Sequence, residues 1–228
     1  MKITYCGHSA MSVENAQGKT VWIDPFLSGN PACTISPDEV KADAIVLTHG
    51  HDDHLGATVA VAKRCQCPVI DVFELASMLE SKGVKVHPMN IGGGYDFGDF
   101  YVKYTLAFHG SSVQENGQFL YAGQPAGVLI RMDGVTLYHA GDTALFKDMA
   151  LIGELNKNDV AALPIGDNFT MGPEDALLAA QWVKAKHVIP IHYNTFPVIE
   201  QDAAKFCDQL KQHGIEGHPL QIGESLEL

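Results

Sequence analysis

The sequence predicts an α/β protein, a layered sandwich in which strands form the middle and helices cover the outer faces. Runs with the two-residue alternation of strands are interleaved with segments whose apolar residues recur at helical spacing. Several neighbouring strand-like runs are separated by tight-turn sequences, which are typical of antiparallel pairs. Antiparallel strands interleaved with helices favour this layered arrangement.

The first half of the chain is expected to open with antiparallel strands and to continue with strand, loop and helix units. The turn residues 15–18 separate two of the opening strands, and Asp24-Pro25 ends that unit. We expect strands at 2–6, 10–14, 20–23, 44–48, 69–72 and 84–87. We expect helices at 55–64 and 74–81, and a glycine-rich turn at 92–94.

The second half returns to strand patterns before it alternates again. The runs 97–109 and 127–139 read as strands, and the dipeptide Asp133-Gly134 favours a tight hairpin in the second of them. We expect further strands at 159–164 and 187–191, two short strands at the end of the chain, and helices at 144–155, 173–185 and 199–213.

A weak internal repeat relates the two halves. Residues 43–56 align without gaps on residues 159–172, with matching apolar runs and both glycines in register. A duplication would place Asp167 where His51 lies in the first copy, near the same mouth. The alternative is that any two strand, loop and helix units look alike at this level.

Composition limits the class of protein. A chain of 228 residues with 46% hydrophobic residues has room for one globular domain, which we expect to span 1–228. The net charge of −12 disfavours nucleic acid, and no apolar run approaches the roughly 20 residues of a membrane-spanning helix. Five cysteines without a CxxC pair and the lack of a leader-like start favour a soluble protein of the reducing cytoplasm.

The loop 48–56 carries the chemistry. It places His49, His51 and His54 beside Asp52 and Asp53 directly after an expected strand. Imidazole nitrogen and carboxylate oxygen are ligands of zinc-like divalent metals, and catalytic sites of this kind leave a position open for water. Three more metal-competent side chains end other expected strands: His109, Asp142 and His192. Together they give seven ligands, enough for two metals that share a carboxylate.

With these motifs the chain resembles the metallo-β-lactamase superfamily of hydrolases over nearly its whole length. The resemblance implies a four-layer αββα sandwich of two similar halves with the metals at one edge. It implies that His49, His51 and His109 hold one metal, that Asp53, His54 and His192 hold the other, and that Asp142 bridges them. The stretches 7–9, 23–31 and 166–173 look more narrowly like a prokaryotic subgroup of metal-dependent hydrolases similar to ascorbate-phosphate lactonases.

The expected activity is hydrolysis of an ester-like bond in a small substrate: a lactone, a thioester or a phosphodiester. A hydroxide that bridges two divalent ions forms near neutral pH, because metals lower the pKa of bound water to about 7. Asp53 is the candidate catalytic residue, since a ligand beside the nucleophile can orient it. Zinc is the first choice of metal and manganese the second.

Three alternatives remain open at this point. Iron-dependent oxidation chemistry occurs on the same scaffold, although di-iron members typically have an acidic residue where this chain has His51, and 228 residues leave no room for a flavin-binding domain. A nucleic-acid processing nuclease is the second alternative, which the acidic charge disfavours. A metal-stabilised structural module is the third, but structural zinc sites are usually closed.

Four more residues are candidates for the surroundings of the metals. Asp24 is expected to fix a ligating imidazole, with a turn cap as the alternative. His8 lines the pocket or is a satisfied structural imidazole. Asp167 and Thr170 are pocket candidates, unless Thr170 only starts the helix that has Pro173 in its first turn. The expected partner is a small molecule, with no membrane, and a symmetric homo-oligomer is the general prior.

Overall fold

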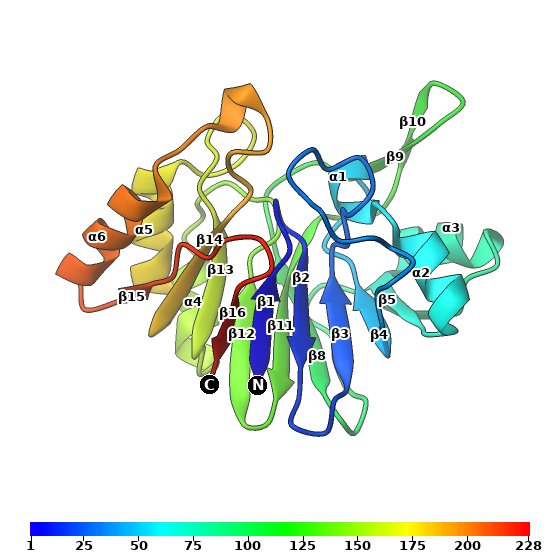
Figure 1. The fold of residues 1–228 in the computed structure, drawn as a ribbon, viewed down its shortest axis with the longest axis horizontal. Helices are drawn as coiled ribbons and strands as arrows, with labels where there is room; N and C mark the ends of the chain where they lie inside the picture. The colour runs from blue at the N-terminus through cyan, green and yellow to red at the C-terminus, as the bar shows by residue number, and fades with distance from the viewer.

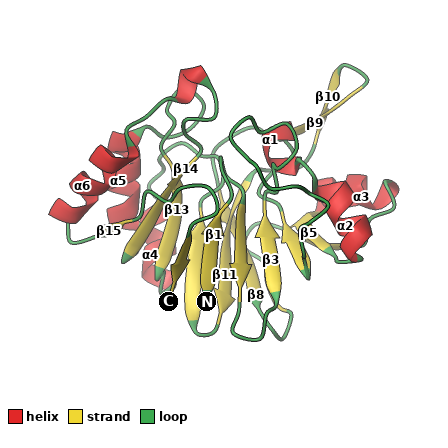
Figure 2. Ribbon diagram, in the orientation of Figure 1, coloured by secondary structure: helices red, strands yellow, loops and turns green.

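The computed structural model describes residues 1–228 and confirms the predicted fold class. Two mixed seven-stranded sheets pack face to face, and helices cover the outer face of each (Figure 1). Figure 2 shows the resulting order of layers, with helices on both flanks and the strands of the two sheets between them. The amino group of Met1 donates to the carbonyl of Leu228 at 2.6 Å, so the two termini lie side by side.

The N-terminal sheet contains both ends of the chain. In spatial order it consists of β16 (Ser225–Glu227), β1 (Lys2–Tyr5), β2 (Met11–Glu14), β3 (Thr20–Ile23), β4 (Ala44–Val46), β5 (Val69–Val72) and β6 (Val86–Met89). Its outer face is covered by α2 (Thr58–Cys65) and α3 (Phe73–Ser81), and the single-turn helix α1 (Asp52–Leu55) lies above the ends of its strands.

The C-terminal sheet has the same design. In spatial order it consists of β7 (Gly94–Asp96), β8 (Tyr101–Leu106), β11 (Ala126–Met132), β12 (Val135–His139), β13 (Val160–Pro164), β14 (His187–Ile191) and β15 (Glu216–Gly217). Its outer face is covered by α4 (Met149–Leu155), α5 (Pro173–Trp182) and α6 (Ala203–Gln212), and a short 3-10 helix η1 (Pro197–Ile199) precedes α6.

The two sheets match strand by strand. In each, the first three pairs in spatial order are antiparallel and the next three are parallel. The match gives β4 and β13 equivalent positions in the two sheets, as the sequence repeat predicts. Asp43, just before β4, accepts a hydrogen bond from the backbone N–H of Thr20 at 2.9 Å, and Asp159, just before β13, accepts one from Thr136 at 3.1 Å.

Hydrophobic packing follows the two-residue period of the strands. On β13, Val160 and Ala162 point into the core between the sheets, whereas Ala161 and Leu163 pack with the helices behind. Both faces of this strand are buried, which explains its continuous apolar run. No helix of this fold is both long and apolar enough to cross a bilayer.

Several predicted boundaries were wrong. The helix expected at 55–64 is two helices, because the chain breaks at Gly56, whose φ is +43° and whose added Cβ would lie 2.5 Å from the carbonyl oxygen of Pro25. The helix expected at 144–155 begins only at Met149. A tertiary contact holds the residues before it outside the helix, because Ala144 donates to the carbonyl of Phe108 at 3.0 Å.

The strands β7, β9 and β10 and the 3-10 helix η1 were not predicted. The strands β9 (Ser112–Glu115) and β10 (Gln118–Tyr121) form a separate hairpin that projects from the body of the molecule (Figure 1). The strand expected at 97–109 is shorter, because only 101–106 is strand, and the expected strand 84–87 lies two residues later. The helix expected at 173–185 ends at Trp182, and the helix expected at 199–213 begins at Ala203, after η1.

Candidate metal centre

The candidate ligands gather at one edge of the sandwich, where strands from both sheets end. Parallel strands place their carboxyl ends at the same edge, which is where α/β proteins commonly bind ligands. The residues concerned lie just after six strands: His8 after β1, Asp24 after β3, residues 49–54 after β4, His109 after β8, Asp142 after β12 and His192 after β14.

The first group consists of His49, His51 and His109, whose candidate ligand atoms all lie within 4.8 Å of one another. Nε2 of His49 is 3.0 Å from Nδ1 of His51. The ring centroids of His51 and His109 are 5.2 Å apart. This is the set that the resemblance assigns to one metal.

The second group consists of Asp53, His54, His192 and also His8, with ligand atoms again within 4.8 Å. Nε2 of His192 is 3.9 Å from Oδ2 of Asp53. His8 approaches the same oxygen, with its Nε2 at 3.2 Å. The structure therefore adds a fourth side chain to the set expected around the other metal.

Asp142 lies between the two groups. Its Oδ1 is 3.2 Å from Nε2 of His54, and its Oδ2 is 3.0 Å from Nε2 of His192. The same Oδ2 is 3.5 Å from Nε2 of His109 and 4.0 Å from Nε2 of His49. A carboxylate in this place reaches both groups, as a bridging ligand must.

Unpartnered atoms show that these residues fit a metal. Nε2 of His54 and Oδ1 of Asp142 are buried and have no hydrogen-bond partner, although they lie 3.2 Å apart. Polar atoms buried without partners are costly, and they are normally satisfied by protein, water or an ion. A cluster of imidazole nitrogens and carboxylate oxygens is the donor set that zinc-like ions prefer.

Asp24 and Thr48 hold two of the imidazoles in place. Oδ2 of Asp24 accepts hydrogen bonds from Nδ1 of His54 at 2.8 Å and from the hydroxyl of Thr48 at 2.6 Å. Because that hydroxyl donates to Asp24, it can accept a hydrogen bond from Nδ1 of His49, which lies 3.0 Å away. Both imidazoles therefore turn their Nε2 toward the centre, an arrangement typical of carboxylate-oriented metal ligands.

Burial and charge act against each other at these groups. Burial lowers the pKa of His54, but the carboxylates of Asp142 and Asp24 outweigh it and hold that pKa well above its usual range. Burial raises the pKa of Asp142, but His54 and His192 hold it well below the ordinary value. Burial also lowers the pKa of His8 to about 4. The opposite charges of the carboxylates and the imidazoles thus stabilise one another within the buried centre.

Backbone strain is concentrated here. His8, Asp24 and His192 have φ values of +57°, +44° and +53°, in the left-handed region that residues with a Cβ rarely adopt. Such strain costs on the order of 1–3 kcal/mol per residue and persists where the surroundings fix the conformation, commonly at functional sites. All three side chains belong to the centre or touch it.

Sequence reasoning missed three contributors. Thr48 lies directly before the histidine motif, and this position could have marked it as a residue that contacts the ligands. Thr195 places its Oγ1 2.9 Å from Nδ1 of His8, 187 residues away. His139 is buried and donates from Nε2 to the carbonyl of Ser9 at 3.0 Å, while its Nδ1 accepts from Gly141 at 3.2 Å. These bonds tie the His8 loop to the turn that carries Asp142.

Comparison with known proteins agrees with this geometry. Residues 2–192 match the Beta-lactamase superfamily domain. A UPF0173 metal-dependent hydrolase from Anoxybacillus flavithermus is 57% identical over 229 residues, with 100% of both chains covered. The chain belongs to the UPF0173 metal-dependent hydrolase family. It is thus a metal-dependent hydrolase, and the His and Asp clusters indicate where the metal site lies.

Solved structures extend the comparison. Igni18, a metallo hydrolase from Ignicoccus hospitalis, is 35% identical, with a TM-score of 0.90 over 99% of this chain and 97% of that one. The metallo-beta-lactamase fold protein YhfI from Bacillus subtilis is 14% identical, with a TM-score of 0.72 over 99% and 98%. The fold expected from the resemblance is confirmed.

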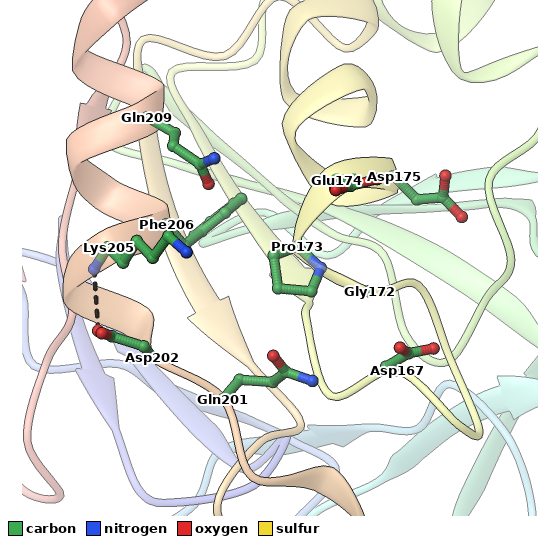
Figure 3. A pocket seen from close by; sticks show the side chains of 10 residues that line it. All are labelled: Asp167, Gly172, Pro173, Glu174, Asp175, Gln201, Asp202, Lys205, Phe206 and Gln209. Atoms are coloured by element: carbon green, nitrogen blue, oxygen red, sulfur yellow. Dashed lines mark hydrogen bonds between the residues drawn. The ribbon is translucent and has the colours of Figure 1, made fainter.

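In this member of the UPF0173 family, Asp167 and Thr170 do not join the candidate metal groups. Asp167 is exposed and lines a cavity of about 540 Å³ between the first turns of α5 and α6 (Figure 3). Thr170 donates from its hydroxyl to the carbonyl of Met171 at 3.3 Å. The start of this loop packs closely against the backbone of His192, because a Cβ added to Gly166 would lie 2.2 Å from the carbonyl oxygen of His192.

Proposed function

We propose that this chain uses two divalent metals to hydrolyse an ester-like bond in a small molecule. The observation that carries the proposal is Asp142, which lies within reach of both candidate groups and has a buried oxygen without a hydrogen-bond partner. One group would contain His49, His51 and His109, and the other Asp53, His54 and His192. Zinc is the first choice of metal and manganese the second, because the donor set is mainly imidazole.

When bound, a pair of divalent ions supplies a nucleophile near neutral pH and polarises the substrate oxygen. Asp53 is the residue that we assign to orient that nucleophile. Its side chain is 31% exposed, whereas that of His54 is fully buried, so Asp53 faces the side from which a substrate enters. His8 holds Asp53 at 3.2 Å, and Thr195 holds His8. Together they fix the direction in which Asp53 accepts a hydrogen bond.

The surroundings favour a substrate with an apolar part. Phe108, directly before His109, is 55% exposed, and Phe26 packs edge-on against His8 with ring centroids 5.6 Å apart. The net charge of −12 opposes polyanions. We therefore rank lactones and thioesters above phosphodiesters. We propose a lactone as the first substrate to test, following the resemblance to ascorbate-phosphate lactonases that the sequence of three loops suggests.

The experiment is a turnover panel of one lactone, one thioester and one phosphodiester on zinc- or manganese-loaded enzyme. His51→Ala serves as the blank, and Asp167→Ala as a control in the other half. We expect turnover of the lactone or thioester that His51→Ala abolishes and Asp167→Ala keeps. Silence on all three substrates, with coloured and redox-active protein after iron loading, would overturn the proposal in favour of oxidation chemistry.

The proposal also covers the domain organisation, the compartment and the partners of the enzyme. We infer one domain over 1–228, supported by the core in which buried side chains of both sheets pack together. Five free cysteines support a reducing compartment, the cytoplasm. A small molecule is the partner, and a homo-oligomer is the general prior for such enzymes.

A further inference from the structure

A second cluster of metal-binding side chains lies at the opposite edge of the C-terminal sheet. His187 begins β14, Glu216 lies on β15, and His218 follows it, with β15 at the outer edge beside α6 (Figure 1). One ligand atom from each lies within 4.8 Å of the others. His192, at the other end of β14, is five residues from His187, which is about 16 Å along a strand.

The spacing of the ligand atoms matches a single small ion. Nδ1 of His187 is 3.0 Å from Nε2 of His218 and 3.4 Å from Oε2 of Glu216. Nε2 of His218 is 3.9 Å from Oε1 of Glu216. In a tetrahedral site with metal–ligand distances of about 2.1 Å, the ligands lie about 3.4 Å apart. The three observed distances between ligand atoms, 3.0, 3.4 and 3.9 Å, lie around that value.

The backbone holds these side chains in place. β15 pairs in parallel with β14, with His187 opposite Glu216. The N–H of His218 donates to the carbonyl of Val188 at 2.8 Å. The His187 and His218 side chains are only 20% and 15% exposed, whereas the Glu216 side chain is 67% exposed. Two of the three ligands are thus positioned before an ion binds, which lowers the entropy lost on binding.

The charges nearby leave room for a cation. Lys186 precedes His187, but its amino group lies 3.7 Å from Oδ1 of Asp159, which Lys157 also approaches at 3.1 Å. Asp159 therefore offsets one of these two positive charges.

We propose that His187, Glu216 and His218 bind one zinc-like divalent transition ion, separate from the dinuclear centre. Two imidazoles and one carboxylate select zinc, nickel or copper over magnesium and calcium, which prefer oxygen ligands. Water completes the coordination on the exposed side. The ion joins the two-residue strand β15 to β14 and so fastens the connection between α6 and the last strand β16.

The test uses the full-length enzyme with its dinuclear centre already loaded and excess metal removed. Zinc is then titrated into the wild-type protein, His218→Asn, Glu216→Gln and the control His213→Asn, which changes an exposed histidine outside the cluster. Uptake of zinc, Tm and hydrolase turnover are followed together. Because Glu216 and His218 lie at the surface edge, both variants are expected to fold.

We expect the wild-type protein and His213→Asn to bind one additional zinc ion per chain. At zinc a hundredfold above Kd, Tm should rise by at least about 5 °C. His218→Asn should weaken this binding by more than about 10-fold and remove most of the rise, and Glu216→Gln should weaken it less, since its side chain is the most exposed ligand. Turnover should stay within about twofold in every variant, because the cluster is remote from the dinuclear centre.

Equal zinc uptake and equal Tm in the wild-type protein and His218→Asn would overturn the proposal and leave the His187–His218 contact as a hydrogen bond only. A loss of turnover that follows the loss of zinc in His218→Asn would also overturn it, because the ion would then belong to the dinuclear centre. Neither result depends on which substrate the enzyme hydrolyses.

Discussion

The loop after β4 and the loop after β13 occupy equivalent places in the two halves but differ in chemistry. The first carries His49 and His51, and the equivalent positions of the second are Ile165 and Asp167. The second half instead supplies His109, Asp142 and His192 from three other strand ends. The repeat thus extends to the framework of strands, while each half fills the shared edge with its own side chains.

At the opposite edge of the sheets, the two halves share the same contacts. Asp43 and Asp159 make equivalent contacts, since each accepts a backbone hydrogen bond from a threonine in the neighbouring strand, Thr20 or Thr136. Each aspartate also returns a backbone N–H to that threonine's carbonyl, at 2.8 Å for Asp43 and 3.0 Å for Asp159. Contacts that secure the fold are duplicated, and contacts that build the centre are not.

The largest expected difference between the halves comes from His51→Ala and Asp167→Ala, which change equivalent positions. His51→Ala should lower kcat/KM by more than about 100-fold, because losing a ligand costs more than losing a residue that only orients one. Asp167→Ala should change it by less than about threefold, since Asp167 is exposed and outside both groups. Steady-state kinetics on metal-loaded protein measures both, and similar losses in the two variants would break the comparison.

The next effect concerns the residue that orients His54. Asp24→Asn should lower metal affinity by about 10- to 100-fold, because the amide cannot hold the protonated Nδ1 of His54 as the carboxylate does. Competition with a chelator measures the change. Asp43→Asn, at the other end of the strands, is the matched control and should leave affinity unaltered. Equal affinity of Asp24→Asn and the wild-type protein would contradict the assigned role.

The duplicated contacts predict a smaller effect of the same kind in both halves. Asp43→Ala and Asp159→Ala should each lower the free energy of unfolding by roughly 1–3 kcal/mol, because a backbone N–H loses its partner. The larger loss is expected for Asp159→Ala, since Thr136 is buried and Thr20 is partly exposed. Urea unfolding measures both. A loss in one variant and none in the other would show that the two contacts are not equivalent.

The smallest predicted effect concerns Asp71 on β5, whose equivalent on β14 is Pro190. Asp71 is fully buried, and its Oδ2 has no hydrogen-bond partner. Burial raises its pKa well above the usual range, so the folded carboxyl stays protonated where the unfolded one, with a pKa near 3.9, ionises. Its contribution to stability is therefore largest below that value and is lost as pH rises.

Asp71→Asn removes this titration without changing the shape of the side chain. The variant should be at least as stable as the wild-type protein at pH 8, and its stability should vary less between pH 5 and pH 8. Urea midpoints at the two pH values provide the measurement. An identical pH dependence in both proteins would show that Asp71 is not a buried neutral acid.

Residue chemistry explains how much the sequence could predict. Histidines and aspartates at the ends of strands predict a metal centre, because the strand ends of an α/β sandwich meet at one edge. The position of His8 could not be settled from the sequence, since its partner Thr195 is 187 residues away. The late start of α4 at Met149 could not be predicted for the same reason, since Ala144 is held outside the helix by a bond to Phe108, which is distant in the sequence.

Anomalous diffraction from crystals of zinc-loaded enzyme tests the central claim most directly, because it locates each ion. We expect two peaks at the shared edge, one about 2.1 Å from nitrogens of His49, His51 and His109 and the other beside Asp53, His54 and His192. Asp142 should lie between them. A single peak at this edge, or two peaks that Asp142 does not join, would contradict the dinuclear centre.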